Sequence, residues 1–394
     1  MRWKTSTGRF IPSSSPRRGG IQRLAATTAL YYAAAHSNHH HQHSQYTGMA
    51  MAYSSTSTNH NRADSCSSSS GGSSSSNVLM QALQGGFTEQ RPLPTHPFMK
   101  IHHVKEPIAS TQDEARRLLL QRNDERSNSD TVQLADDEEF LAVVADQQEA
   151  GRGTNGRTWE SSAGNMYLTV ALPMAKIPVM LTMLPLQIAV LVAERAEIVL
   201  QHCGSSIKTT PGEESSTPRI RVKWPNDVLL CDPKLDYDAK LSGTLIESVS
   251  VQNESWFLIG IGINVMHAPN LNKSPGKQIR PAVSLQSYCG ENLPEHTALY
   301  LGTDLAYALA DWVVTTNNNS TLSRTEADQA VLQAWKARAD FGKAYEIRSN
   351  NVEEEASDNY RGEQVVAVDI ALDGQLKILG EDGKERLLVS DYFF

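Results

Sequence analysis

The chain has 394 residues, a net charge of −8 and 40% hydrophobic residues, which allows about two or three domains and a sizeable core. The negative charge predicts no broad basic surface, so nucleic acid is not an expected partner. The most apolar window, 177–193, contains Pro185 and Gln187 and predicts a buried helix, because it is too short and interrupted to span a membrane. The four cysteines are scattered without a C-x-x-C pair, which argues against a zinc site or a disulfide framework.

The N-terminal region differs in composition from the rest of the chain. No Asp or Glu precedes Asp64, whereas arginines recur among Ser, Thr and Ala, a pattern typical of organelle transit peptides. We therefore expect a mitochondrial or plastid location, with the cytoplasm as the alternative. The stretch "SCSSSSGGSSSSN" at 65–77 is typical of a flexible linker, and the His-rich run at 36–43 is interpreted as low-complexity sequence. Residues 1–95 are predicted to be a disordered N-terminal region.

Beyond this region, apolar patterns predict alternating strands and helices. The first strand is expected in "MKIHHVKEPIAS" (99–110), and a capping box of Thr111 and Glu114 predicts a helix from about Thr111. The polar, acidic stretch 123–139 is predicted to be a loop insertion. The apolar run "FLAVVAD" (140–146) predicts a buried strand.

The middle of the chain continues with strands around one helix. "NMYLTVAL" (165–172) predicts a strand, and apolar residues at helical spacing predict a helix over 186–202 that ends before Gly204. "RIRVKW" predicts a strand that ends at Pro225. Two further strands, 241–251 and 256–265, are expected in one sheet, with a hairpin across the polar residues between them.

The C-terminal part reads as two helices followed by a β-rich tail. Helices are expected at about 295–315 and 325–341, and short strands separated by Asp-Gly turns follow them. The pattern predicts a small β-barrel over 341–394.

The glycine loop "GRGTNGRTW" (151–159) matches two phosphate-binding patterns. It contains G-x-G-x-x-G, and it differs from G-x-x-x-x-G-K-[ST] only by Arg157 in place of Lys. Both patterns require a helix after the loop, whereas the stretch at 165–172 predicts a strand, so we reject both interpretations. Flexible glycines beside the guanidiniums of Arg152 and Arg157 nevertheless suit an anionic ligand.

Three further stretches combine glycine, proline or lysine with strand ends. In "VKWPNDVLL" (222–230), Lys223 lies at a strand end before Pro225, and a simple surface cation is the alternative interpretation. In "KLSGTLIES" (240–248) and "GIGINV" (260–265), glycine interrupts a strand. This indicates a bulge, close backbone approach to a ligand, or tight packing of strands.

Taken together and in this order, these motifs resemble the biotin protein ligase family over about Met99–Phe394. The similarity rests on "AST" with its capped helix, "QQEAGRGTNGRTW", "GNMYLTV", "VKWPND", "KLSGTLIE" and "GIGINV". It implies an α+β fold with a class II synthetase-like catalytic domain at 96–340, built on a mixed, largely antiparallel sheet. It also implies a C-terminal SH3-like β-barrel domain at 341–394. The N-terminal region has no helix-turn-helix pattern, so the DNA-binding role of some bacterial relatives is not implied.

The resemblance implies an ATP-dependent ligase. Such an enzyme forms biotinyl-5′-AMP and transfers biotin to a lysine of the biotin carboxyl carrier domain of a carboxylase such as acetyl-CoA carboxylase. Mg²⁺ is expected with ATP; its protein ligands are unassigned, with Asp227 as the one candidate. Monomer and homodimer are both left open, and no membrane partner is expected.

By similarity, Lys223 and Arg152 are expected to act in catalysis, because fixed cations would screen the repulsion between a carboxylate and an α-phosphate. Residues expected to bind biotin are Ser110, Thr111, Gln112, Gln148, Arg152, Gly153, Thr154 and Lys223. Residues expected to bind ATP or the adenylate are Gly151, Arg157, Trp159, Asn165, Asn226 and Asn264.

Two alternatives remain open at this stage. A lipoate or octanoate protein ligase would share the catalytic fold and also use a lysine to hold an acyl group. An inactive biotin- or carrier-binding module would belong to a different functional class, although Lys223 and Arg152 argue against it.

Thr154 generates a first prediction, because the family often has Arg at this position of the loop. The missing cation removes one charge-assisted contact to the adenylate, so we expect Thr154→Arg to slow adenylate dissociation. The measurement is the loss of radiolabelled adenylate from the purified protein, and an unchanged rate would contradict the hypothesis.

Overall fold

The computed structural model describes residues 78–85, 93, 95–127, 140–204, 217–235, 238–251, 253–269, 281–346 and 364–388. The expected transit peptide, the His-rich run at 36–43 and the linker at 65–77 lie outside the described residues. Within the described ranges, no helix combines the length and apolar character needed to cross a membrane.

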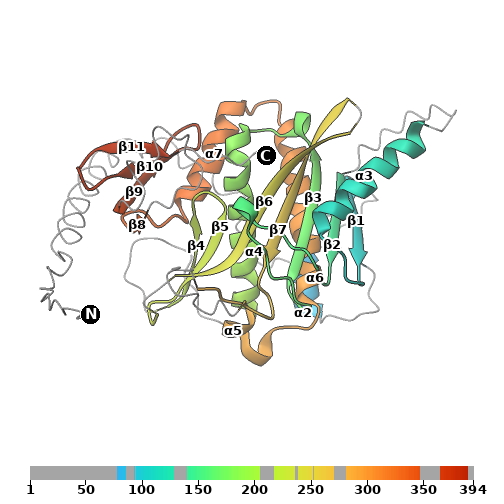
Figure 1. The fold of residues 1–394 in the computed structure, drawn as a ribbon, viewed down its shortest axis with the longest axis horizontal. Helices are drawn as coiled ribbons and strands as arrows, with labels where there is room; N and C mark the ends of the chain where they lie inside the picture. The colour runs from blue at the N-terminus through green and yellow to red at the C-terminus, as the bar shows by residue number, and fades with distance from the viewer. Residues whose placement is uncertain are drawn as a thin grey trace, which may run out of the picture.

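Seven strands form the central sheet in the order β1-β2-β3-β7-β6-β5-β4 (Figure 1). β1 and β2 run parallel, and all other neighbours run antiparallel. The predicted mixed, largely antiparallel sheet is therefore confirmed. The strands are β1 Met99–Val104, β2 Phe140–Ala145, β3 Met166–Pro173, β4 Arg219–Lys223, β5 Asp227–Cys231, β6 Asp238–Val251 and β7 Glu254–Ile263.

Alternation along β7 gives the sheet two different faces. Phe257 and Ile259 pack into the main core, whereas Leu258 packs on the opposite side. Because successive side chains of a strand point to opposite faces, Gly260 and Gly262 lie on the same side as Leu258. That side of β7 therefore lacks side chains toward its C-terminal end.

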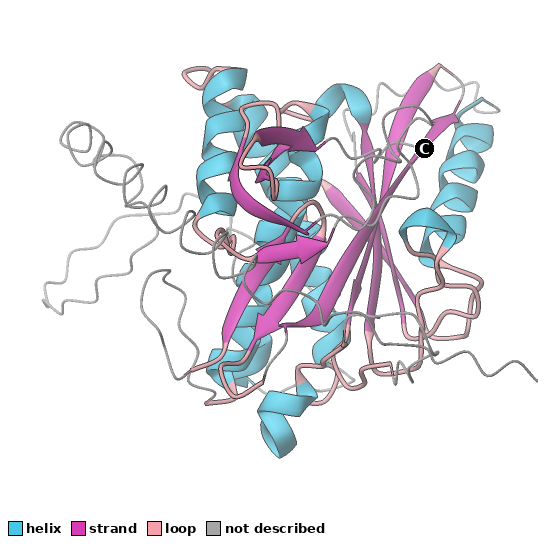
Figure 2. Cartoon of the chain, turned by 60° about the vertical axis from the view of Figure 1, so that its left-hand side comes forward, coloured by secondary structure: helices cyan, strands magenta, loops and turns pink. Residues whose placement is uncertain are grey.

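The helices divide between these two faces (Figure 2). Side chains of α4, α6 and α7 join the main core, whereas α3 supplies Ala115 and Leu119 to the smaller cluster on the other face. The helical segments are α2 Val78–Gly85, α3 Thr111–Ser127, η2 Thr154–Gly156, η3 Met174–Lys176, η4 Leu181–Met183, α4 Leu184–His202, α5 Gln286–Cys289, η5 Gly290–Asn292, α6 Thr297–Asn318 and α7 Arg324–Lys336. The predicted long helices are confirmed, although α7 ends before the expected residue 341.

The predicted disorder of residues 1–95 is wrong at α2. Leu79 is 1% exposed in the main core, and its backbone N–H donates to Asp304 Oδ1 at 3.1 Å. The apolar residues of α2 pack against α6, which gives this short helix a tertiary partner that composition alone does not reveal.

The start of α3 also differs from the prediction. Ser110, one residue earlier than expected, caps the helix: its Oγ accepts from Asp113 N at 3.1 Å. Thr111 N instead donates to the side chain of Gln148. α3 continues to Ser127, so the first residues of the predicted loop insertion are helical.

One strand of the sheet was not predicted. The turn after Lys223 leads directly into β5, which pairs with β4 and β6, so "VKWPND" forms the tip of a hairpin. The predicted pairing of the strands at 241–251 and 256–265 is confirmed as β6 and β7. Gly204, with φ of 75°, follows α4 as expected.

The C-terminal residues form a separate four-stranded sheet in the order β11-β10-β9-β8 (Figure 1). Its strands are β8 Ala344–Glu346, β9 Gln364–Ile370, β10 Leu376–Leu379 and β11 Glu385–Leu388. Within the described residues, the edge strands β8 and β11 do not pair with each other, so this sheet does not close into a barrel there. Trp224 Nε1 donates to Gly374 O at 2.9 Å and links the two sheets.

Candidate active site

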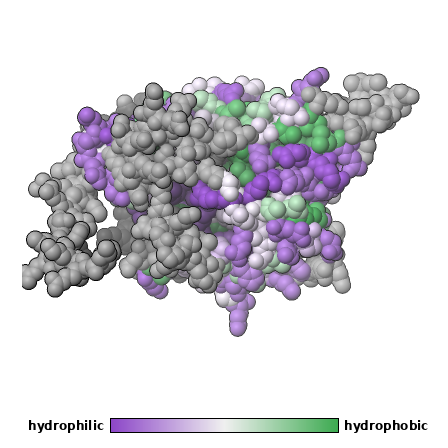
Figure 3. Space-filling model, in the orientation of Figure 1, coloured by the Kyte–Doolittle hydropathy of each residue, from purple (hydrophilic) through white to green (hydrophobic). Residues whose placement is uncertain are grey.

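A cavity open to solvent lies on the α3 side of the central sheet, with about 490 Å³ of empty space when the solvent at its mouth is included. Figure 3 shows a band of hydrophilic side chains across this view of the molecule. The lining residues come from the start of α3, the segment 148–159 that contains the glycine loop, the turn between β4 and β5, and strands β3, β6 and β7. They are Ser110, Thr111, Gln112, Gln148, Arg152, Gly153, Thr154, Trp159, Tyr167, Leu168, Asn226, Lys240, Gly243, Thr244, Leu245, Gly260, Ile261 and Gly262.

Glycines of β6 and β7 form the floor of the cavity. A Cβ atom at Gly262 would lie 2.6 Å from the Trp159 indole, and one at Gly243 would lie 3.1 Å from it. A Cβ atom at Gly260 would lie 3.0 Å from the Gln112 side chain. The two side chains therefore rest directly on the backbone, as glycine-interrupted strands allow. Trp159 Nε1 is buried without a hydrogen-bond partner in the described part of the chain.

Neutral polar groups cluster at the α3 end. Gln148 Oε1 accepts from Thr111 N at 2.8 Å and from Thr111 Oγ1 at 3.2 Å. Gln148 Nε2 donates to Ser161 Oγ at 3.0 Å, and Thr169 Oγ1 donates to Thr111 Oγ1 at 2.8 Å. Because Ser110, Thr111 and Gln148 carry no charge, this end suits a neutral ligand group with donors and acceptors.

Lys240 is the lysine that lines the cavity. Its ammonium lies 2.5 Å from Asp227 Oδ1 and 5.5 Å from the centre of the Trp159 ring. It also lies beside Gly243, where a Cβ atom would come within 3.0 Å of Nζ. A lysine held by one carboxylate can exchange that partner for the anionic group of a ligand.

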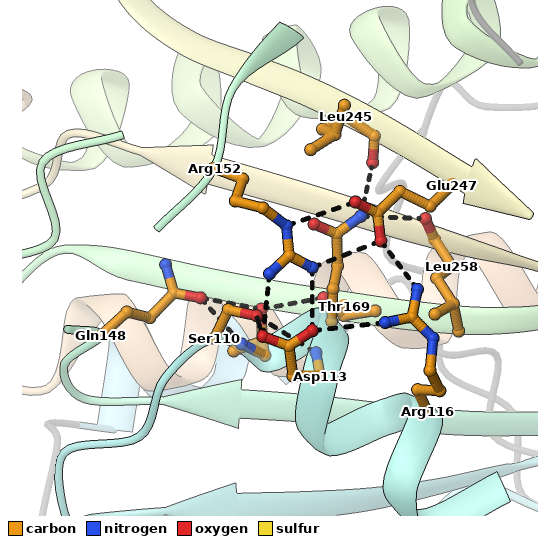
Figure 4. Close-up of polar contacts among 11 residues, drawn as sticks. Ser110, Asp113, Arg116, Gln148, Arg152, Thr169, Leu245, Glu247 and Leu258 are labelled. Atoms are coloured by element: carbon orange, nitrogen blue, oxygen red, sulfur yellow. Dashed lines mark hydrogen bonds and ion pairs between the residues drawn. The ribbon is translucent and has the colours of Figure 1, made fainter. Parts of the chain in front are cut away.

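Arg152 occupies a charge-balanced network with Asp113, Glu247 and Arg116 (Figure 4). We call these four residues the ion quartet. Arg152 donates to Asp113 Oδ2 at 2.8 Å and Oδ1 at 3.0 Å, and to both Glu247 oxygens at 3.3 Å. Arg116 donates to Asp113 at 3.3 Å and to Glu247 at 3.1 Å. The quartet joins the glycine loop to α3 and β6.

The quartet also shifts the pKa values of two of its members, Asp113 and Arg152. Hydrogen bonding from Arg152 is the main cause that lowers the pKa of Asp113, although partial burial opposes the shift. The bond to Asp113 raises the pKa of Arg152 in turn. Nearby, burial raises the pKa of Tyr167, so this phenol lines the cavity in its neutral form. Asp113 and Arg152 therefore stay ionised at neutral pH.

The cavity brings together most of the residues predicted from sequence. Those that line it are Ser110, Thr111, Gln112, Gln148, Arg152, Gly153, Thr154, Trp159 and Asn226. The predicted residues that do not line it are Gly151, Arg157, Asn165, Lys223 and Asn264.

Lys223 is not among the residues that line the cavity, and its expected role in catalysis stays a prediction. Lys223 ends β4, and its ammonium lies 5.8 Å from the centre of the Tyr345 ring, on the side of the C-terminal sheet. Ile220 and Val222 pack into the main core, so alternation along β4 places Lys223 on the same face of the sheet as the glycine floor. It lies opposite Asp227, which in turn lies opposite Gly243. Lys240, which begins the quoted stretch "KLSGTLIES", does line the cavity.

The other residues outside the cavity stabilise the surrounding backbone. Asn165 Oδ1 accepts from the N–H groups of Val265, Met266 and His267 at 2.9 to 3.0 Å. Asn264 Nδ2 donates to Val283 O at 3.1 Å. The side-chain amides of Asn165 and Asn264 are therefore hydrogen-bonded to the backbone of the chain. Nucleotide contacts by either residue stay a prediction.

Within the glycine loop, Gly151 and Arg157 have structural contacts. A Cβ atom at Gly151 would lie 2.4 Å from Ser161 Oγ and Trp159 O, so only glycine fits without a shift. Arg157 is exposed and donates to Thr154 O at 3.1 Å.

Sequence reasoning missed Asp113, Glu247 and Lys240 as site residues. All three lie within or beside the quoted motifs, so their presence was visible, but their partners come from other elements. At the glycine interruptions, the chain's own side chains lie close to the backbone, Trp159 and Lys240 at Gly243 and Gln112 at Gly260, and close approach to a ligand stays a prediction.

One possible metal-binding group lies outside the cavity. Among the described residues, ligand atoms of Cys231, Asp238 and Asp340 lie within 4.8 Å of one another. The Lys343 ammonium pairs with Asp238 and lies 3.8 Å from Asp340, so a cation already balances these carboxylates. Burial raises the pKa of the Cys231 thiol to about 12, which favours the protonated form over a metal-binding thiolate.

Comparison with known proteins identifies the family. Residues 119–264 match the Biotin/lipoate A/B protein ligase family. The Biotin--[acetyl-CoA-carboxylase] ligase of Paracoccus denitrificans is 30% identical over 224 residues, which cover 56% of this chain and 80% of that protein. The chain belongs to the biotin protein ligase family.

Other biotin ligase relatives share shorter or more distant similarity. The Bifunctional ligase/repressor BirA of Salmonella typhimurium is 35% identical over 126 residues, and the match spans 32% of each chain. A biotin protein ligase structure from Leishmania major in complex with biotin is 22% identical, with a TM-score of 0.45 over 75% of this chain and 100% of that one. This degree of overlap carries no argument about the site.

The glycine floor generates a prediction about ligand binding. Gly262→Ala should displace Trp159, because the added methyl group would overlap the indole at 2.6 Å, and should weaken ligand binding with a small effect on folding. Intrinsic fluorescence and biotin titration measure the two effects. Ser255→Ala, at the exposed start of the same strand, is the matched control. Equal binding by both variants would contradict the role of the floor.

Proposed function

We propose that the chain is an ATP-dependent biotin protein ligase that forms biotinyl-5′-AMP and transfers biotin to a carrier-domain lysine. Family membership supports the proposal, and its main structural support is the set of residues that line the cavity. A neutral polar cluster around Thr111 and Gln148 lies at one end, with a lysine and an aromatic ring nearby. Biotin has a neutral ureido ring and an anionic carboxylate tail, and this arrangement matches both.

In the first step, the biotin carboxylate oxygen attacks the α-phosphorus of ATP. A C–O–P linkage forms, and the bond to pyrophosphate breaks. Both reacting groups are anionic, so a fixed cation lowers the barrier by stabilising the developing charge. We assign this role to Lys240 rather than Lys223, because Lys240 lines the cavity and its ammonium is paired with the carboxylate of Asp227 alone among the ion pairs of the described residues.

In the second step, the amine of the acceptor lysine attacks the acyl carbon of the adenylate. An amide bond forms and AMP leaves, so the step requires no nucleophile from the chain. Gln148, Thr111 and Gln112 would orient the ureido ring, and Trp159 would cover the ligand on the glycine floor. Arg152 is expected to act through the loop, since two carboxylates hold its guanidinium.

We also propose that Mg²⁺ binds together with ATP. No Asp or Glu belongs to the lining residues, and Asp227 beside them is paired with Lys240. Among the described residues, those that line the cavity therefore do not form a protein cage for the ion.

Further parts of the proposal concern the context of the enzyme. We propose acetyl-CoA carboxylase or a related carboxylase as the acceptor, targeting to a mitochondrion or plastid by the N-terminal region, and a catalytic domain at 96–340. The C-terminal sheet is proposed to complete an SH3-like barrel within 341–394. Composition and motif order support these proposals, and the homodimer stays open.

The function is tested by incubating the full chain with ATP, Mg²⁺, biotin and an apo carrier domain. We expect carrier labelling detected with streptavidin, together with pyrophosphate release. Labelling with lipoate in place of biotin would favour the lipoate ligase alternative, and the absence of both products would favour an inactive binding module.

The choice between two lysines gives a second prediction. Lys240→Ala should lower the rate of adenylate formation by about 100-fold or more, because removal of a charge-stabilising group from an active site has effects of this size. Lys223→Ala is the matched control and should keep most of the activity. Pyrophosphate release and thermal unfolding are measured for both. A larger loss of adenylate formation in Lys223→Ala than in Lys240→Ala would assign charge stabilisation to Lys223 instead.

A further inference from the structure

The glycine loop (151–159) is a small hairpin with its own hydrogen bonds. Trp159 N donates to Gly151 O at 2.9 Å, and Gly153 N donates to Arg157 O at 2.7 Å. Arg152 and Thr158 form a bridge between its two arms. A hairpin held together in this way can move as one unit when its links to the rest of the chain change.

Arg152 links this hairpin to two other elements. Its guanidinium binds Asp113 on α3 and Glu247 on β6 (Figure 4). Arg116 contacts the same two carboxylates from the far side. The ion quartet thus spans the edge of the cavity, and it is balanced in charge without a ligand.

The hydrogen bonds of Arg152 argue against a direct role as an anion ligand. Nε, Nη1 and Nη2 all donate to carboxylate oxygens, so a ligand anion would have to displace Asp113, Glu247 or both. Lys240, with Asp227 at 2.5 Å, needs to exchange a single carboxylate. The charge of Arg152 is therefore used to hold the loop.

We propose that Asp113 and Glu247 are positioning residues that latch the glycine loop over the bound adenylate through Arg152. The latch governs how long the intermediate stays in the cavity, whereas Lys240 governs its formation. This inference rests on the proposed function, since it assigns adenylate retention to the loop. No bond to the ligand forms or breaks in the latch itself.

The exposure of the quartet makes this latch reversible. The exposed fractions of the side chains are 35% for Arg152, 39% for Asp113, 37% for Arg116 and 21% for Glu247. Partly exposed ion pairs are weakened by salt, because mobile ions screen them. Opening of the loop should therefore increase with ionic strength.

The test measures loss of labelled adenylate from the full-length protein after a chase with unlabelled biotin. Glu247→Gln removes one charge of the quartet and should speed this loss by about two- to fivefold. It should also reduce the dependence of the rate on salt between about 0.05 and 0.5 M. The rate of adenylate formation should change less than the rate of its loss, which a general disturbance of the fold would not produce.

Glu114→Gln is the matched control. Glu114 lies on the same helix and pairs with Arg117 at 2.6 Å, away from the lining residues. This variant should lose adenylate at the wild-type rate. Equal rates for Glu247→Gln and Glu114→Gln would overturn the latch.

A ligand-free measurement separates failure of the latch from failure of the proposed function. Arg157 is exposed in the loop, so trypsin cleavage after it reports loop opening in the absence of substrates. Cleavage should be faster in Glu247→Gln than in Glu114→Gln, and wild-type cleavage should accelerate with salt relative to a denatured reference substrate. If the wild-type protein makes no adenylate, this result contradicts the proposed function but not the closure of the loop by the ion quartet. Should Glu247→Gln not fold, wild-type cleavage that is independent of salt would still overturn the latch.

Discussion

The absence of side chains at Gly243, Gly260 and Gly262 is the constraint on which the cavity depends. These glycines let Trp159 and Gln112 approach the backbone of β6 and β7 to distances that a Cβ atom would forbid. On the opposite face of β7, Phe257 and Ile259 are fully buried in the main core. The same strands therefore anchor the fold on one side and leave space for a ligand on the other.

Electrostatics then distinguish the two cations that line this space. Arg152 and Lys240 both face the cavity, and both are paired with carboxylates. Two acids hold Arg152, whereas one holds Lys240, so an incoming anion competes more easily for the lysine. The site thus separates a group that positions a loop from a group that meets the substrate.

Local patterns predicted most elements of the fold because alternation and helical spacing depend on near neighbours. They failed where a distant contact changed the outcome. α2 becomes ordered by packing on α6, with Leu79 bound to Asp304, and Ser110 rather than Thr111 caps α3 because Thr111 is bound to Gln148. β5 was missed because "VLL" is too short to predict a strand until β4 and β6 lie beside it.

The sequence by itself determined the family, through the order of its motifs, and the neutral residues of the cavity, through their place in those motifs. Only the tertiary structure shows which lysine belongs to the lining of the cavity. Lys223 and Lys240 both lie beside strand turns, and nothing local distinguishes them. The pairing of β5 with β6 brings Lys240 to Asp227 and Trp159, whereas Lys223 lies opposite Asp227 in the register of β4 and β5, with its ammonium 5.8 Å from the centre of the Tyr345 ring. Strand register joins residues far apart in the chain, and local sequence patterns do not encode it.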